Sequence, residues 1–163
     1  MNLFYKLFAK NNRENFDISN LIWSWIGSFL GLFAIAFFHR NFLDDSDLTL
    51  VLSSFGASAV LIYGAINSPL AQPKNLIGGH IISAIIGVFC YKLFGENLLF
   101  AAAIAVSSSI LVMQLTLTLH PPGGATALIA VIGTPQIHDL GYFFVIFPVF
   151  SGALILFLIA FVI

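Results

Sequence analysis

Long apolar runs make up most of this chain, and short polar stretches separate them. The runs cover residues 21–38, 48–66, 76–94, 98–119 and 142–163. Each is close to the ~20 residues that a helix needs to cross the hydrocarbon core of a bilayer. The apolar residues are continuous and do not alternate with polar ones, so a transmembrane β-barrel is not expected. The pattern predicts an all-α fold, a polytopic transmembrane helical bundle of five to six membrane segments.

A break interrupts this pattern at Pro121-Pro-Gly-Gly124. Prolines lack a backbone donor and glycines favour irregular backbone, so we expect a break here, a short helix over 125–132 and a loop over 133–141. Irregular backbone at membrane depth is tolerated where it is buried in protein or lines a wet cavity. A helix that starts there offers free N–H groups and a partial positive charge, which suits an anion.

An internal repeat places a second break earlier in the chain. Gly56-Ala-Ser-Ala59 matches Gly124-Ala-Thr-Ala127 at an offset of 68, and in both places a Pro-containing loop and a full apolar span follow. We therefore expect two copies of three segments, 21–94 and 98–163. An odd number of crossings inverts the second copy, as in many transporters. Ser53–Ser58 would then be a break equivalent to the later one, giving two broken or re-entrant helices.

The residue count between Leu98 and Gly133 leaves two arrangements open. This stretch holds either two short, broken elements that meet at mid-membrane or one full helix followed by a re-entrant half-helix. We favour the short, broken elements, because they preserve the repeat.

The first 18 residues differ from the rest and predict an amphipathic helix at the membrane interface, with 19–163 as the transmembrane domain. Apolar side chains share one face and basic side chains lie elsewhere, which favours a surface with anionic headgroups. A partly ordered basic tail is the alternative. The residues concerned are Leu3, Phe4, Leu7 and Phe8 on the apolar face, and Lys6, Lys10 and Arg13.

Composition agrees with a membrane protein. Only 8% of the residues are charged and the mean hydropathy is +1.02, whereas a soluble domain has about 25% charged residues. The net charge of −1 gives no reason to expect nucleic acid as a partner, and the lipid bilayer is the expected environment. The spans contain no acidic residue, and no Ser/His/Asp set, carboxylate pair or HExxH motif is present. We therefore expect no enzyme activity and no cofactor.

A metal site is not expected either. Asp44, Asp45 and Asp47 do not have the spacing of an EF-hand loop, and capping of the next helix by Ser46 or Asp47 is the favoured interpretation. His80 and His120 have no acidic residue or thiolate near them in sequence. His39 and His138 fall in predicted loops, where we expect no specific role.

The candidate site is the space between the two predicted helix starts at mid-membrane. Its hydroxyls and backbone N–H groups suit a small inorganic anion, and the histidines could gate, carry a proton for symport, donate to the anion or simply cap a carbonyl. The predicted binding residues are Ser53, Ser54, Gly56, Ser58, His120, Gly123, Gly124 and Thr126. The predicted pathway residues are Gln72, Lys74, Asn75 and His80.

Close helix packing is the competing explanation for the small residues. Gly27 and Gly31 form a GxxxG pair, and a second stripe of small residues follows the third span at Gly79, Ser83 and Gly87. Such stripes let helix backbones approach closely, either within one chain or between subunits. We expect a homo-oligomer.

Two motifs carry a resemblance to a known family. His120-Pro-Pro-Gly-Gly-Ala-Thr-Ala-Leu128 resembles the HPP family of integral membrane proteins, and so do Phe55-Gly-Ala-Ser-Ala-Val60, Ser68-Pro-Leu-Ala-Gln-Pro-Lys-Asn75 and Gly78-Gly-His80. The resemblance covers residues 21–163. Lys74 departs from the family, in which this position is usually Arg, and it keeps the charge without the bidentate fork.

The resemblance implies a multi-pass membrane protein, and nitrite as the substrate, because photosynthetic family members have been assigned nitrite transport. A bacterial inner (plasma) membrane is the expected location. Since some relatives carry a soluble regulatory domain, a membrane-anchoring or sensing module without transport is the alternative, and an intramembrane enzyme is a more distant one.

Overall fold

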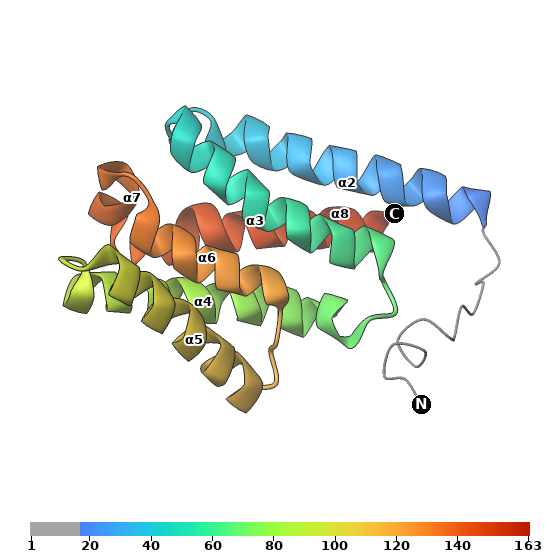
Figure 1. The fold of residues 1–163 in the computed structure, drawn as a ribbon. Helices are drawn as coiled ribbons and strands as arrows, with labels where there is room; N and C mark the ends of the chain where they lie inside the picture. The colour runs from blue at the N-terminus through green and yellow to red at the C-terminus, as the bar shows by residue number, and fades with distance from the viewer. Residues whose placement is uncertain (1–16) are drawn as a thin grey trace, which may run out of the picture.

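A bundle of long helices forms the protein in a computed structural model that describes residues 17–163 (Figure 1). Five helices are long and apolar enough to cross a membrane, and no strand occurs among the described residues, so the predicted all-α polytopic bundle is confirmed. The interfacial helix predicted for residues 1–18 lies almost wholly outside the described residues. The spanning helices are α2 (Ile18–His39), α3 (Asp45–Gly64), α4 (Pro73–Phe94), α5 (Leu98–Leu115) and the Val145–Val162 segment, which contains α8 (Ser151–Val162) after a π-helical turn, η2 (Val145–Phe150).

Three shorter elements complete the described part of the chain: η1 (Pro69–Ala71), α6 (Pro121–Ile132) and α7 (Pro135–Leu140). The 12 residues of α6 extend only about 18 Å at 1.5 Å per residue, which is too short to cross a bilayer. The stretch from Leu98 to Gly133 is therefore one full helix followed by a short one, and the two short, broken elements that we favoured are wrong. The loop predicted over 133–141 contains α7.

Helix α6 lies inside the bundle and contacts α3, α4 and α5 (Figure 1). In the view of Figure 1, α2 and α3 pair above it, and α4 and α5 pair below it. The start of α2, the loop after α3 and the α5–α6 connection all lie at one end of the bundle. We call this end the N-terminal end.

The break predicted at Ser53–Ser58 is absent, because α3 is a continuous helix. A glycine within a helix costs about 1 kcal/mol relative to alanine. Gly56 alone is therefore not enough to break a packed helix of 20 residues. The serine hydroxyls also bond within the helix. Ser53 Oγ, for example, donates to the carbonyl oxygen of Thr49 at 2.8 Å, which keeps the polar group satisfied without opening the backbone.

The Pro-Pro-Gly-Gly sequence is the first turn of α6, so the helix begins at Pro121 and not at residue 125. Prolines are tolerated at this place because the first N–H groups of a helix have no partner within it. His120 is the N-cap residue, with extended φ and ψ of −138° and 105°. That conformation is the one favoured directly before a proline.

Small residues let α4 and α6 pack closely, as predicted for the stripe of Gly79, Ser83 and Gly87. A Cβ atom added to Gly79 would lie 2.5 Å from the Cβ of His120, and one added to Gly87 would lie 2.6 Å from the carbonyl oxygen of Ala127. The two contacts occur in the same order along α4 and along α6, so these helices run parallel. This close approach sets the position of His120 relative to α4.

The GxxxG pair of α2 packs inside the chain. An added Cβ would lie 2.7 Å from the Tyr63 ring at Gly27 and 2.6 Å from Leu156 at Gly31. The Tyr63 hydroxyl donates to the carbonyl oxygen of Leu156 at 3.1 Å, which joins α3 to α8. The GxxxG stripe is thus filled by this chain's own side chains, and the homo-oligomer stays a prediction.

The acidic loop before α3 is a structural joint. Asp44, rather than Ser46 or Asp47, caps the helix: its side chain accepts from the backbone N–H of Asp47 at 2.8 Å. Asp47 is fully buried, and its carboxylate accepts from both the backbone N–H and the hydroxyl of Thr134. These bonds fix the α6–α7 connection to the start of α3.

Candidate functional site

Five of the predicted residues meet in one buried polar cluster where α3, α4 and α6 come together. No side chain in it is more than 2% exposed. The members, which we call the polar cluster, are Ser54 and Ser58 from α3, His80 from α4, His120 as the N-cap residue of α6, and Thr126 from the middle of α6.

The Ser58 hydroxyl lies at the centre of the polar cluster. Its Oγ is 2.8 Å from Nε2 of His80 and 2.9 Å from Nε2 of His120. The two imidazole rings approach edge to face, with centroids 5.0 Å apart. A single hydroxyl therefore links both histidines.

The outer ring nitrogens continue the hydrogen bonds in two directions. Nδ1 of His80 is 2.7 Å from the Thr126 hydroxyl, which is 3.0 Å from that of Ser54. Nδ1 of His120 is 2.9 Å from the carbonyl oxygen of Leu70 in η1. The hydrogen bonds thus form an unbroken path from Ser54 to Leu70.

This path leads from the middle of the bundle toward its N-terminal end. Ser54 lies at the midpoint of α3, and Ser58 lies six residues before the end of that helix, or about 9 Å at 1.5 Å per residue. Leu70 is only half-buried, in the loop region that follows α3. On the other side of Ser54, the buried side chain of Val51 belongs to the hydrophobic core.

The polar cluster is complete without a ligand. Within residues 17–163, every buried side-chain nitrogen and oxygen has a hydrogen-bond partner. The surroundings are apolar, since the Phe55 ring packs 4.8 Å from that of His80. Unpaired polar groups are costly in such surroundings, so pairing is what allows two imidazoles and three hydroxyls to be buried together.

The predicted glycines and Ser53 do not supply donors to the polar cluster. Ser53 is exposed, and a Cβ at Gly56 would meet nothing within 4 Å. A Cβ at Gly123 would lie 2.8 Å from the Ser83 hydroxyl and 3.0 Å from the carbonyl oxygen of Gly79 on α4, whereas one at Gly124 would make only an ordinary contact with Val106, at 3.7 Å. Of the three glycines, only Gly123 is needed for the close packing of α6 on α4.

The pair of opposed helix N-termini that we predicted is also absent. Helix α3 does not start near the site, so α6 alone begins there. Pro121 and Pro122 have no backbone N–H, and the N–H of Gly123 already bonds to the carbonyl oxygen of His120 at 2.8 Å. The donors available to an anion are consequently side-chain hydroxyls and imidazole N–H groups.

The other predicted pathway residues lie near the N-terminal end of the bundle, where the hydrogen-bonded path also ends. Gln72, the N-cap residue of α4, and Lys74 are exposed. Asn75 is half-buried, and its amide donates to the carbonyl oxygen of Leu119 at 2.8 Å. Asn75 therefore joins the start of α4 to the connection before His120.

His39 is a buried residue for which the sequence predicted no specific role. It ends α2 and does not lie in a loop; its ring nitrogens bond to the carbonyl oxygen of Ile35 at 2.7 Å and to the hydroxyl of Ser151 at 2.9 Å. The available signal was its place directly after an apolar run. His138, in α7, stacks on Tyr91 with ring centroids 3.6 Å apart.

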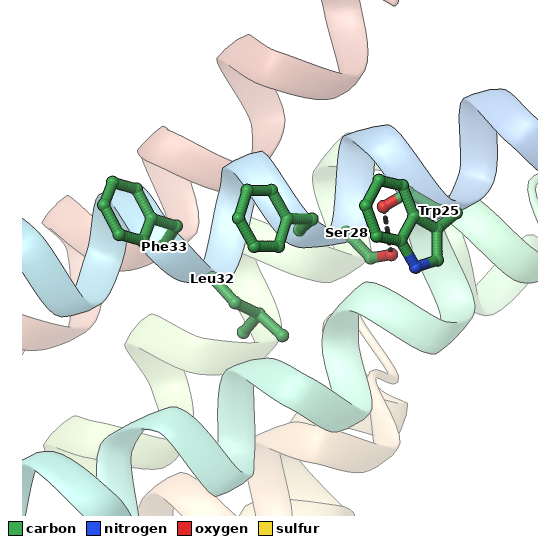
Figure 2. Close-up of a pocket in the computed structure, with 5 residues that line it drawn as sticks. Trp25, Ser28, Leu32 and Phe33 are labelled. Atoms are coloured by element: carbon green, nitrogen blue, oxygen red, sulfur yellow. Dashed lines mark hydrogen bonds between the residues drawn. The ribbon is translucent and has the colours of Figure 1, made fainter.

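A groove on the outer face of α2 is separate from the polar cluster (Figure 2). The rings of Trp25 and Phe29 stack there at 5.5 Å, and Phe33 continues the stack at 5.9 Å. The Ser28 hydroxyl is satisfied within α2, because it donates to the carbonyl oxygen of Trp25 at 3.1 Å. Such a face suits contact with lipid. Its lining residues are Trp25, Ser28, Phe29, Leu32 and Phe33.

No three His, Cys, Asp or Glu side chains gather to hold a metal ion in the part of the chain that the structure describes.

The fold and the polar cluster define a multi-pass α-helical integral membrane protein with a histidine–hydroxyl cluster inside the bundle.

The chain belongs to the HPP transmembrane family, because residues 13–163 match the family described as "HPP, transmembrane region". This match confirms the resemblance seen in the sequence.

Two transmembrane proteins of Dictyostelium discoideum are similar to this chain, with 47% and 43% identity over 150 residues. These residues are 90% of this chain but only 52% and 48% of the relatives, so the chain spans about half of their length. Both come from a eukaryote and give no support to a bacterial plasma membrane, which stays a prediction. No solved structure matches the chain.

Proposed function

We propose that this protein transports a small monovalent inorganic anion across the membrane by way of the polar cluster, with nitrite as the first substrate to test. The observation that carries the proposal is the complete burial of two histidines and three hydroxyls inside a membrane bundle. Polar side chains at this depth are costly and commonly mark the pathways of ions and protons.

The chemistry of the polar cluster favours an anion over a cation. Its members offer O–H and N–H donors and contain no carboxylate. When bonds among the cluster members open, the hydroxyls of Ser58 and Thr126 and an N–H of His80 become free to donate to an anion. These donors are bonded within the protein in the structure described here, so an anion can bind only after those bonds open.

An inverted repeat is part of the proposal, and it is supported by contacts at the repeat offset. Ser58 and Thr126 are equivalent in the two motifs, and they bind opposite ring nitrogens of the same histidine, His80. Ser54 donates to the carbonyl oxygen of its own equivalent, Pro122, at 3.0 Å. Equivalent residues meet in this way beside the two-fold axis of an inverted repeat.

Flux into proteoliposomes tests the transport function. The purified full chain is reconstituted, and uptake of nitrite, nitrate, formate and chloride is measured under pH gradients of either direction. We expect uptake of at least one of these anions by the wild type. Absence of uptake of all four from folded protein would contradict the proposal.

A histidine pair supplies the matched control. His120→Ala removes a cluster member, and a lost buried hydrogen bond of about 1–3 kcal/mol corresponds to a fall in rate of roughly 5- to 150-fold. His138→Ala removes the same atoms from α7, outside the polar cluster, and should leave the rate near that of the wild type. Equal rates in the two folded variants would remove His120 from the mechanism.

A membrane-anchoring or sensing module is the second candidate. It is supported by the hydrogen bonding of the polar cluster, in which the buried side-chain nitrogens and oxygens already have partners within the protein, and by the greater length of the relatives. Such a module would show no anion uptake, and His120→Ala would lower only its stability. The flux assay therefore separates the two functions.

A further inference from the structure

We propose that the polar cluster is a directional proton relay, in which His80 and His120 are held as opposite tautomers and pass protons toward the Leu70 end. The relay rests on the proposed function in one respect: it would couple proton movement to the anion. The observation behind it is the unbroken order of hydrogen bonds from Thr126 to Leu70.

The tautomers of His80 and His120 can be assigned from the Leu70 end of the path, where the carbonyl oxygen can only accept a hydrogen bond. The Leu70 carbonyl oxygen can only accept, so Nδ1 of His120 carries a hydrogen and donates to it. Nε2 of neutral His120 then has a free lone pair and accepts the Ser58 hydroxyl hydrogen. His120 is therefore the Nδ1–H tautomer.

The same reasoning gives His80 the other tautomer. Ser58 has donated its only hydrogen to His120, so its Oγ must accept from Nε2–H of His80. Nδ1 of neutral His80 is then an acceptor for the Thr126 hydroxyl. Every donor along the path points the same way, from Thr126 through His80 and Ser58 to His120.

This order allows one proton to enter and one to leave. A proton supplied by water, or by the acid form of the anion, bonds to Oγ1 of Thr126 as the original O–H bond breaks and a new N–H bond forms at Nδ1 of His80. The Nε2–H bond of His80 then breaks and its proton goes to Ser58 Oγ, while the Ser58 proton bonds to Nε2 of His120.

The last transfer releases the proton at the N-terminal end. The Nδ1–H bond of His120 breaks, and the proton passes to water at the half-buried Leu70. No electrons are transferred, and both rings end as neutral imidazoles with exchanged tautomers. When the bonds of the polar cluster open, each ring exchanges its proton with water and the next cycle can begin. The Nδ1–H bond of His80 and the Nε2–H bond of His120 break, each proton going to water, and N–H bonds form with protons from water at Nε2 of His80 and Nδ1 of His120.

No carboxylate or ammonium group takes part in the path among residues 17–163. Asp47 on α3 is bonded to Thr134 at the start of its helix, away from Ser58. Lys74 and Lys92 lie near the two ends of α4, and η1 and α6 contain no charged residue. The two histidines are thus the titratable groups that face each other across Ser58.

Nitrogen-15 NMR of the full chain in lipid bilayers, labelled at histidine, tests the tautomers without any transport. His39→Asn and His138→Asn together remove the signals of the two histidines outside the polar cluster. We expect one Nδ1–H and one Nε2–H tautomer from the remaining pair. The Thr126→Val variant should shift the Nε2–H signal, which assigns it to His80. Two identical tautomers would overturn the relay.

Proton movement into proteoliposomes, followed with an internal pH dye, tests the relay itself. Thr126→Val keeps the side-chain shape and removes the hydroxyl, so we expect a fall of about tenfold or more in proton movement. Thr126→Ser restores the hydroxyl and should restore the rate. Full proton movement in folded Thr126→Val would contradict the relay.

The two proposals fail separately. Anion uptake without proton movement would overturn the relay and leave anion transport standing. Opposite tautomers together with hydroxyl-dependent proton movement, but no anion uptake, would support the relay and overturn anion transport.

Discussion

Replacement of Gly79 by alanine tests the close approach of α4 and α6 that positions His120. The added Cβ would lie 2.5 Å from the Cβ of His120 and 2.9 Å from the carbonyl oxygen of Thr118. Neither atom is the end of a flexible side chain, so the helices must separate. Overpacking of this kind costs about 1–3 kcal/mol, and the better helix propensity of alanine returns only about 1 kcal/mol.

Gly56→Ala is the matched control for this prediction. Gly56 lies in a helix too, but a Cβ there would meet nothing within 4 Å. The propensity gain is common to both variants, so the difference between their unfolding free energies isolates the clash, at about 1–3 kcal/mol.

Titration with sodium dodecyl sulfate in mixed micelles, followed by circular dichroism, measures both unfolding free energies. We expect Gly79→Ala to be less stable than the wild type, and Gly56→Ala to be as stable or more stable. If Gly79→Ala proved as stable as Gly56→Ala, the packing of α4 on α6 described above would be wrong.

Three further substitutions test individual hydrogen bonds and one strained backbone position, and the same titration measures their unfolding free energies. Asp47→Ala removes the acceptor of two bonds from Thr134 and should lower stability by about 1–3 kcal/mol; an unchanged value would contradict this joint. Tyr63→Phe keeps the ring but removes the hydrogen bond to the carbonyl oxygen of Leu156. We expect the unfolding free energy to fall by about 1 kcal/mol, and an unchanged value would show that this bond does not stabilise the fold. Leu117→Gly relieves a left-handed residue with a φ of 56° and should raise stability by about 1 kcal/mol, whereas a decrease would show that the exposed leucine side chain matters more than the backbone.

The spanning helices were predictable because their signal is long. Hydropathy summed over about 20 residues identifies α2, α3, α4 and α5 despite single polar positions. Patterns of only a few residues gave wrong predictions. Ser53-Ser-Phe-Gly56 suggested a broken helix, yet hydroxyl-to-carbonyl bonds along α3 and packing on its neighbours keep that helix regular.

The start of α6 shows a different limit. The sequence placed a break at Pro121, and a break does occur, but it lies before the prolines and not across them. Proline is favoured in the first turn of a helix but disfavoured in its interior, so position within the helix decides the outcome. The loss of the free N–H groups followed from the same two prolines.

The members of the polar cluster were found in the sequence, but their connections were not. Ser58, His80, His120 and Thr126 were each chosen for residue type and depth in the membrane. That one hydroxyl joins two imidazoles depends on how α3, α4 and α6 cross, which sequence spacing does not specify. His39 was missed for the same reason, since its partner Ser151 lies 112 residues away.

The Ser58 hydroxyl offers the most direct test of the claim that the polar cluster is the transport site. Ser58→Ala removes one oxygen and leaves Nε2 of both histidines without a partner. Ser53→Ala makes the same change on the exposed face of the same helix. The measurement is the initial rate of nitrite uptake by equal amounts of folded protein, with the wild type alongside. We predict a rate near that of the wild type for Ser53→Ala and a rate lower by roughly 5- to 150-fold for Ser58→Ala. Equal uptake by the two variants would contradict the claim.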